Sequence, residues 1–464
     1  MSAGKVYLVG AGPGDIGLIT LTGYRLLQQA DVILYDHLLS IELLSIAKDQ
    51  CKKIPVGKHA GKHTLPQESI NQLIVDKAKE GKMVVRLKGG DPYIFGRGGE
   101  EGEKCYEDGI YFEVVPGVTS AFSAPCYAGI PPTHRDCTTN VAVVTGHRKA
   151  GDDRPIDIPK AGTLIFLMSV GNIPRIIDQM LGEGWDGETP MAVIEHGTWY
   201  DQRVIEGKLN TFKDFIKENP LRTPGIFVVG SVVGMKEKLG WFARKPKILM
   251  LGTLPQKYTH MGTIVHRQLI ECVWLDDYTD ADKQIDRLND FEWVVFTSAN
   301  GIRYFFERLK LKGLDARAFS DCKVGVIGKT TASTLQEYGI NADLCADKES
   351  SKGLLAKFDG VDIKGAKILL PQALVSSEGL PKGLEEMGAT IEKMPAYKTV
   401  EKECADVDFD YIDQILFTSG SCVEAFVKRF GKVPENVKAY CLGTPTQEIA
   451  AENGINAEIA KKDK

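Results

Sequence analysis

The sequence of 464 residues lacks the marks of several specialised classes of protein. Its ten cysteines include no Cys-x-x-Cys pair and no metal-ligand spacing, so we expect reduced core cysteines and no metal site. No apolar run reaches the roughly 18 residues of a membrane-spanning helix, and no cationic and apolar leader precedes the first expected strand. The net charge of −5 is small and indicates no nucleic-acid partner. The composition therefore predicts a cytoplasmic protein that acts without nucleic acid, membrane or metal.

Glycine, by contrast, is frequent, with 48 residues, and it recurs where expected strands end. Strands that alternate with helices and short glycine turns predict an α/β fold. At about 150 residues per domain, the length predicts three or four domains. We expect α/β subdomains at about 1–117 and 118–244, a charged hinge at 235–247, and a new unit from 246 to 464.

Residues 84–101 have the most specific pattern in the chain, VVRLKGGDPYIFGRGGEE. A buried strand passes there into a glycine turn at 89–92, where the backbone must approach another group closely. A second glycine turn, GAGPGD at 10–15, follows the first expected strand. A surface loop would explain an isolated pair of glycines, but it does not explain so specific a run.

The alternative for residues 10–15 is the GxGxxG fingerprint of dinucleotide-binding proteins. Asp15 stands where the third glycine belongs, and that glycine lets helix and strand pack closely. Pro13 also removes one amide donor from a phosphate cradle. The pattern therefore disfavours a nicotinamide cofactor.

Both glycine motifs resemble those of the uroporphyrinogen-III C-methyltransferases, which start sirohaem and cobalamin synthesis. The resemblance implies the two-domain α/β fold of the tetrapyrrole methylases over residues 1–244, S-adenosylmethionine as methyl donor, and a homodimer formed through this half. A methyltransferase that acts later in cobalamin synthesis is the alternative, and the pattern at 84–101 argues against it. Core packing is the alternative role for two of the implied cofactor residues, Ile94 and Met168. The implied cofactor-binding residues are Pro13, Gly89, Gly90, Asp91, Ile94, Thr119, Ser120, Met168 and Gly197.

Methyl transfer to a pyrrole carbon needs alignment of the reactants and then loss of a proton. The resemblance places the proton acceptor at Asp36 and the proton donor at Lys58. The alternatives are a helix cap for Asp36 and a solvated side chain for Lys58. A substrate with eight carboxylates also needs cations nearby. The candidates on the neighbouring loops are Lys62, His63, Arg97, His134, Arg135, His147 and Arg148.

The second half contains an internal repeat. WVVFTS at 293–298 recurs as QILFTS at 414–419, and KVGVIG at 323–328 recurs as VKAYCLG at 437–443. Each copy reads as strand, turn, helix, strand, turn, helix, which is typical of a doubly wound parallel sheet. Ligands of such sheets lie at the carboxyl ends of the strands. We therefore expect one cleft lined by Thr297, Ser298, Gly328, Thr330, Thr331, Thr418, Ser419 and Ser421.

Four short motifs of this half resemble uroporphyrinogen-III synthase, namely FTSANG at 296–301, IGKTTA at 327–332, LLPQA at 369–373 and YKT at 397–399. The resemblance implies a two-lobed, doubly wound parallel α/β fold. Lobe one is expected at about 246–277 plus 400–464, and lobe two at about 278–399.

The same resemblance implies closure of hydroxymethylbilane with inversion of its ring D. It assigns help with water loss to Tyr397, for which a structural hydrogen bond between lobes is the alternative. Gly252 stands where synthases usually show an arginine. That departure leaves open a non-catalytic, synthase-like module that binds a pathway partner.

Together, the two resemblances predict an enzyme that makes uroporphyrinogen III and methylates it at C2 and C7, giving precorrin-2. They do not separate the sirohaem branch from the cobalamin branch. The second copy of the repeat reaches 454–458 without a counterpart of the helix expected at 349–358. We therefore expect either a shortened lobe or a covering second chain, because helices cover both faces of such a sheet.

Overall fold

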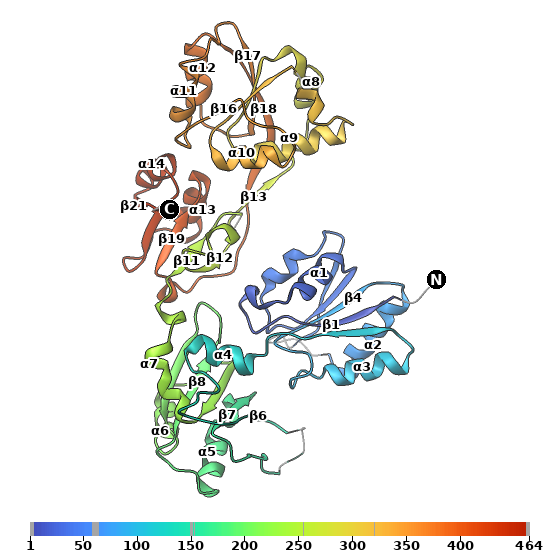
Figure 1. Cartoon of the computed structure of the whole chain (residues 1–464), viewed down its shortest axis with the longest axis vertical. Helices are drawn as coiled ribbons and strands as arrows, with labels where there is room; N and C mark the ends of the chain where they lie inside the picture. The colour runs from blue at the N-terminus through green and yellow to red at the C-terminus, as the bar shows by residue number, and fades with distance from the viewer. Residues whose placement is uncertain are drawn as a thin grey trace. The chain divides into compact units, whose positions relative to one another are not determined.

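The computed structural model describes residues 4–57, 65–148, 152, 154–253, 255–319 and 321–460. The chain divides into two compact units, the first ending at Lys245 and the second beginning at Pro246. Each unit contains two β-sheets with helices packed against them (Figure 1). The α/β fold class expected from the sequence is confirmed.

The first subdomain is a parallel five-stranded sheet in the order β3-β2-β4-β1-β5. Apolar cores lie on both faces of this sheet, which explains why its central strands are nearly continuous apolar runs. The strands are β1 (Val6–Gly10), β2 (Val32–Tyr35), β3 (Lys52–Pro55), β4 (Val84–Lys88) and β5 (Phe112–Val115). The helices are α1 (Leu21–Gln29), α2 (Gln67–Lys79) and α3 (Gly98–Glu107), with short 3-10 turns at Ile16–Leu18 and Ile41–Ile46.

The second subdomain is a mixed sheet in the order β6-β7-β10-β8-β9, in which only β6 and β7 are parallel. Helix α4 packs on one face of this sheet, and α5 and α6 pack on the other. The strands are β6 (Val141–Thr145), β7 (Thr163–Leu167), β8 (Pro190–Glu195), β9 (Arg203–Lys208) and β10 (Gly225–Val229). The helices are α4 (Ser120–Ala128), α5 (Ile173–Gly182), α6 (Phe212–Glu218) and α7 (Lys236–Leu239).

The segment 235–247 contains the division between the two units, as expected, but most of it forms short helices of the first unit. Its first part forms α7, and a 3-10 turn follows at Phe242–Arg244. Phe242 is buried, with 3% of its surface exposed. Lysines and arginines dominate the composition of the segment. The aromatic side chains of Trp241 and Phe242, however, determine where it packs.

The second unit also contains two sheets. The smaller one is parallel, with the order β12-β11-β19-β20-β21. Its strands are β11 (Lys247–Met250), β12 (Thr263–His266), β19 (Gln414–Phe417), β20 (Lys438–Cys441) and β21 (Ala457–Ile459). Its helices are α13 (Gly420–Phe430) and α14 (Thr444–Glu452).

The larger sheet has the order β13-β18-β17-β14-β15-β16. All its pairs are parallel except the edge pair of β13 and β18. Its strands are β13 (Ile270–Val273), β14 (Trp293–Phe296), β15 (Lys323–Val326), β16 (Leu344–Cys345), β17 (Lys367–Ala373) and β18 (Thr390–Glu401). Its helices are α8 (Thr279–Asp286), α9 (Ala299–Leu311), α10 (Lys329–Gln336), α11 (Ser351–Phe358) and α12 (Gly379–Glu386).

The internal repeat appears as two equivalent halves of these sheets. β14, β15 and β16 are neighbours in one sheet, as β19, β20 and β21 are in the other. Ser298 caps α9 and Ser419 caps α13, each from extended backbone and through its side-chain oxygen. The helix expected near 349–358 is α11, and the absence of a counterpart after β21 concerns residues outside the described ranges.

One expected lobe boundary differs from the structure. β13 pairs with β18, with Cys272 opposite Thr399, so residues 270–273 belong to the larger sheet and not to lobe one. The pairing is antiparallel and joins residues more than a hundred positions apart, so no local pattern reveals it.

Candidate cofactor and substrate sites

Three glycine loops meet where β1, β4 and β5 end. Gly12 and Gly90 exchange two backbone hydrogen bonds, of 3.2 and 2.8 Å. A Cβ on Gly117 would lie 2.2 Å from the carbonyl oxygen of Gly90, a contact that no side chain can make. Glycine is therefore required there because the three backbones touch.

Asp91 joins two of these loops. Its Oδ1 accepts the Tyr93 amide at 2.8 Å, and its Oδ2 accepts the Gly117 amide at 3.0 Å. Gly90 has a φ of +68°, which turns the chain sharply just before this aspartate. The family resemblance implies that Asp91 binds the cofactor. In the structure its carboxylate fixes the glycine loop, whose backbone would contact a ligand.

The second subdomain contributes the facing elements of the site. Thr119 caps α4, with its hydroxyl accepting the Ala121 amide at 3.3 Å, so Ser120 is the first residue of that helix. Gly197 packs against α4, because a Cβ there would lie 2.3 Å from the Cβ of Ala124. Met168 follows β7 and is half exposed.

Backbone strain concentrates around this site. Among the described residues, five that are not glycine have positive φ angles between 47° and 74°. Each such residue costs on the order of 1–3 kcal/mol and persists where surrounding structure imposes it, commonly at functional sites. They are Phe95, Arg97, Met168, His196 and Thr198.

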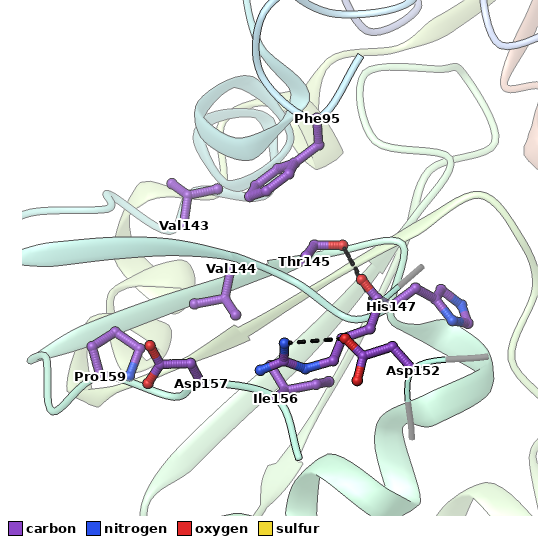
Figure 2. Close-up of a pocket in the computed structure, with 10 residues that line it drawn as sticks. Phe95, Val143, Val144, Thr145, His147, Asp152, Ile156, Asp157 and Pro159 are labelled. Atoms are coloured by element: carbon purple, nitrogen blue, oxygen red, sulfur yellow. Dashed lines mark hydrogen bonds and ion pairs between the residues drawn. The ribbon is translucent and has the colours of Figure 1, made fainter. Parts of the chain in front are cut away.

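Two adjoining hollows open beside the glycine loops, with Phe95 and Val143 lining both. The smaller, of about 240 Å³, is lined by Tyr93, Ile94, Phe95, Thr119, Ala121, Phe122 and Val143. The larger, of about 530 Å³, holds Thr145, His147 and Asp152 at one end (Figure 2), and Arg148 also lines it. Arg148 pairs with Asp152 there at 3.6 Å.

Apolar side chains with large exposed surfaces surround the smaller hollow. Tyr93 is 56% exposed, and Ile94, Phe95 and Phe122 are each 43–44% exposed. A cluster of exposed apolar side chains commonly marks a binding surface. For Ile94 and Met168, exposure therefore favours a binding role over the alternative of core packing.

A buried network of three charged side chains, Arg86, Lys88 and Glu101, lies behind Asp36. Arg86 and Lys88 of β4 both contact the Glu101 carboxylate, at 2.9 and 3.0 Å, and Arg86 also donates to Asp36 Oδ1 at 2.5 Å. Glu101 is fully buried, and both cations are at most 3% exposed. Burial lowers the pKa of Lys88, with the charge of Arg86 acting in the same direction. Among the described residues, Asp36 Oδ2 accepts no hydrogen bond, so this oxygen is available to a ligand.

The sequence pattern does not by itself indicate the roles of Arg86, Lys88 and Glu101. The available signal was two charged residues, two positions apart, in a strand that is otherwise apolar. In a strand, such residues point to the same face and need a common counter-ion. Glu101 supplies it from α3.

The predicted cations are distributed unevenly. Arg97 lies beside the site, with 55% of its side chain exposed, and pairs with Glu100 at 3.0 Å. His134 and Arg135 are not among the residues that line the two hollows. The predictions for Lys58, Lys62 and His63 concern residues outside the described ranges.

In the second unit, Tyr397 lies at the carboxyl end of the larger sheet. Its hydroxyl is 3.2 Å from the Ser298 hydroxyl, which caps α9, and its ring stacks on Tyr304 with centroids 5.2 Å apart. Burial raises the pKa of Tyr397, so the phenol stays protonated and able to donate. This arrangement brings together two residues predicted for the synthase cleft.

The remaining residues predicted for the cleft differ in their contacts and exposure. Ser419 contacts the Ser421 hydroxyl at 3.0 Å, at the start of α13. Thr297 is partly exposed directly after β14. Thr331 is only 4% exposed within α10, so it does not face an open cleft as expected. Thr331 lies in the first turn of α10, on the same buried face as Thr334 and Leu335.

The described residues hold no cluster of three or more histidine, cysteine or acidic side chains placed to bind a metal ion. No helix in the described ranges is both long and apolar enough to cross a membrane.

Comparisons with known proteins match each half of the chain. Residues 5–213 match the family of Tetrapyrrole (Corrin/Porphyrin) Methylases, and residues 258–463 match Uroporphyrinogen-III synthase HemD. The chain is similar over its whole length to the porphyrin biosynthesis protein HemD of Ruminiclostridium josui, with 36% identity and 96% of that protein covered.

Other relatives match only part of the chain. The siroheme synthase of Methylobacillus flagellatus is 47% identical over 252 residues, which is 54% of each protein, so the chain spans about half of that relative. A crystal structure of uroporphyrin-III-C-methyltransferase from Thermus thermophilus is 40% identical. The match covers 51% of this chain and 96% of that one, with a TM-score of 0.44.

Proposed function

The chain belongs to the family of the porphyrin biosynthesis protein HemD, with a tetrapyrrole methylase domain followed by a uroporphyrinogen-III synthase domain, and from this premise we propose its two reactions. The second unit closes hydroxymethylbilane to uroporphyrinogen III with inversion of ring D. The first unit methylates that product at C2 and C7, giving precorrin-2. The observation that carries this proposal is the full-length match to a relative, together with the two domain matches in one chain.

S-adenosylmethionine is the methyl donor, and when bound it supplies an electrophilic methyl group on a sulfonium. The residues of the first unit fit such a molecule. The exposed apolar wall at Tyr93, Ile94, Phe95 and Phe122 suits an adenine ring. Backbone groups of the glycine loops, fixed by Asp91, suit the polar remainder. We assign cofactor binding to the predicted set, Pro13, Gly89, Gly90, Asp91, Ile94, Thr119, Ser120, Met168 and Gly197.

Asp36 acts as the proton acceptor for the methylated macrocycle. Arg86 fixes one of its oxygens, and the other is available, with 26% of the side chain exposed. Lys58 is proposed as the proton donor. Arg97, Lys62, His63, His134 and Arg135 are proposed to bind the substrate carboxylates, because a substrate with eight of them needs several cations.

In the second unit, the Tyr397 hydroxyl assists departure of water from hydroxymethylbilane. Its raised pKa keeps the proton available, and Ser298 orients the group. We propose that Thr297, Ser298 and Ser419 contact the substrate, whereas the buried Thr331 does not. A hydroxyl can donate to a leaving oxygen without a charged acid, which suits a cleft among strand ends.

A cytoplasmic homodimer formed through the first unit is also part of this proposal. The relatives named siroheme synthase favour sirohaem as the final product over cobalamin. Size-exclusion chromatography with light scattering tests the dimer.

The two activities are tested separately. Hydroxymethylbilane without S-adenosylmethionine should give the type III isomer, whereas spontaneous closure gives the uninverted isomer. Uroporphyrinogen III with S-adenosylmethionine should gain two methyl groups. Failure of the first assay alone would reduce the second unit to a non-catalytic module, and failure of the second alone would remove the methylation proposal.

A further inference from the structure

The loop 10–15 is held in place from the second subdomain of its own unit. The Asp15 amide donates to Thr198 Oγ1 at 3.1 Å, and the Trp199 indole donates to the Pro13 carbonyl oxygen at 3.2 Å. The Tyr127 hydroxyl of α4 donates to Asp15 Oδ2 at 2.8 Å. The loop that carries the proposed cofactor residue Pro13 therefore depends on side chains far away in the sequence.

Asp15 is the centre of these contacts. Its Oδ1 accepts the Gly17 amide at 2.8 Å, and Tyr127 supplies the donor for Oδ2. Gly14 leaves no room for a side chain, because a Cβ there would lie 2.2 Å from the Trp199 indole nitrogen. The position of the loop is thus fixed on one side by packing and on the other by the tyrosine hydroxyl.

The Tyr127 ring is itself held by the last residues of the first unit. Trp241 and Phe242 each place their ring centroids 4.9 Å from that of Tyr127. The Trp241 indole donates to the Cys126 carbonyl oxygen at 3.1 Å. Gly129, which ends α4, touches the backbone of Gly240, since a Cβ there would lie 2.5 Å from that amide nitrogen.

We propose that Tyr127 is a positioning residue for cofactor binding, which holds the loop 10–15 through Asp15 while Trp241 and Phe242 hold its ring. This inference rests on the proposed function, because it names how the same site is kept in shape. Helix α4 starts at the site residues Thr119 and Ser120 and ends at this aromatic cluster. The segment leading to the second unit therefore supports the cofactor loop of the first.

A hydrogen bond to a carboxylate contributes more than one between neutral groups. Without the Tyr127 hydroxyl, Oδ2 of Asp15 turns to water and the loop samples other positions. The cofactor would then bind only those molecules in which the loop 10–15 is in the binding position. That cost appears in affinity, since the reacting groups align as before once the cofactor is bound.

The test compares full-length Tyr127→Phe and Trp241→Leu with wild type and with a control, Phe215→Leu. Phe215 is an exposed aromatic residue on α6 and takes no part in the cluster. We expect the KM for S-adenosylmethionine to rise about tenfold in both variants, with kcat within about twofold of wild type. The control should match wild type in both.

Hydrogen exchange of the cofactor-free protein gives a readout that does not depend on the proposed reaction. The peptide covering residues 10–18 should exchange faster in Tyr127→Phe, by about tenfold, while α5 keeps its wild-type rate. A uniform rise over both segments would show a purely structural role, and an unchanged loop would also overturn the inference. If wild type binds S-adenosylmethionine normally and Tyr127→Phe leaves the KM for it unchanged, the inference is overturned. Absence of binding in wild type together with a faster loop would instead reject the proposed function and leave the support of the loop established.

Discussion

At the scale of single residues, Asp36 shows how the fold orients the carboxylate that we propose as proton acceptor. Arg86 holds one carboxylate oxygen at 2.5 Å and is itself paired with Glu101 on the other side. Burial lowers the pKa of Arg86, but the charges of Glu101 and Asp36 more than offset it and leave the pKa raised. The guanidinium therefore remains charged and presents Asp36 in one orientation.

Substituting Asp36→Asn removes the proposed proton acceptor while keeping the shape of the side chain. We expect methylation to slow by about 10²–10⁴-fold, the usual contribution of a positioned acid–base group. Affinity for S-adenosylhomocysteine, measured by calorimetry, should stay close to that of wild type. A wild-type methylation rate would show that Asp36 serves only as a partner of Arg86.

Tyr397→Phe tests the residue proposed for water loss in the second unit. The substitution keeps the stacking on Tyr304 and removes only the hydroxyl that contacts Ser298. We expect slower closure and a larger share of the uninverted isomer, because the spontaneous reaction then competes. Chromatographic separation of the two isomers measures this, and an unchanged ratio with an unchanged rate would make Tyr397 structural.

At the scale of elements, the loop between β8 and β9 carries a histidine with two acceptors. His196 Nδ1 lies 2.8 Å from Asp201 Oδ2, and Nε2 lies 3.0 Å from the Thr223 carbonyl oxygen. Only the imidazolium can donate to both. The hydrogen bond to Asp201 raises the pKa of His196, against the opposing effects of burial and of Arg222.

This raised pKa predicts how stability changes with pH. The stabilising contribution of His196 should be complete below its ordinary pKa of 6.5 and be lost as pH rises through the higher folded-state value. Melting temperatures of wild type and His196→Asn, from about pH 5.5 to about pH 8.5, check this. Their difference should shrink as pH increases, and a difference that is constant or grows would contradict the assignment.

Elements differ in how far the sequence predicts them. β1 and β4 are largely apolar runs that end in glycine turns, so the two strands and the close backbone approach at their ends could be predicted. Local patterns could not predict the packing of Trp241 and Phe242, because the lysines and arginines around them dominate the composition. The partnership of β4 and α3 through Glu101 was missed for a related reason, since buried charges are recognised only when their counter-ion is known.

At the scale of the whole molecule, the sequence predicted two α/β units and the repeat within the second. The repeat could be found because Ser298 and Ser419 follow equivalent strands and cap equivalent helices. The pairing of β13 with β18 could not be found, because it joins residues separated by most of the unit. The proposed roles of Asp36 and Tyr397 come from a resemblance to known families, because the fold alone assigns no reaction to either side chain.

The central claim is that one chain carries out two consecutive reactions. Mass spectrometry of the products formed from hydroxymethylbilane and S-adenosylmethionine carrying a deuterated methyl group tests it most directly. The account predicts a dominant cyclic product of the type III series with two labelled methyl groups. A product without label, or a labelled product of the uninverted series, would contradict it.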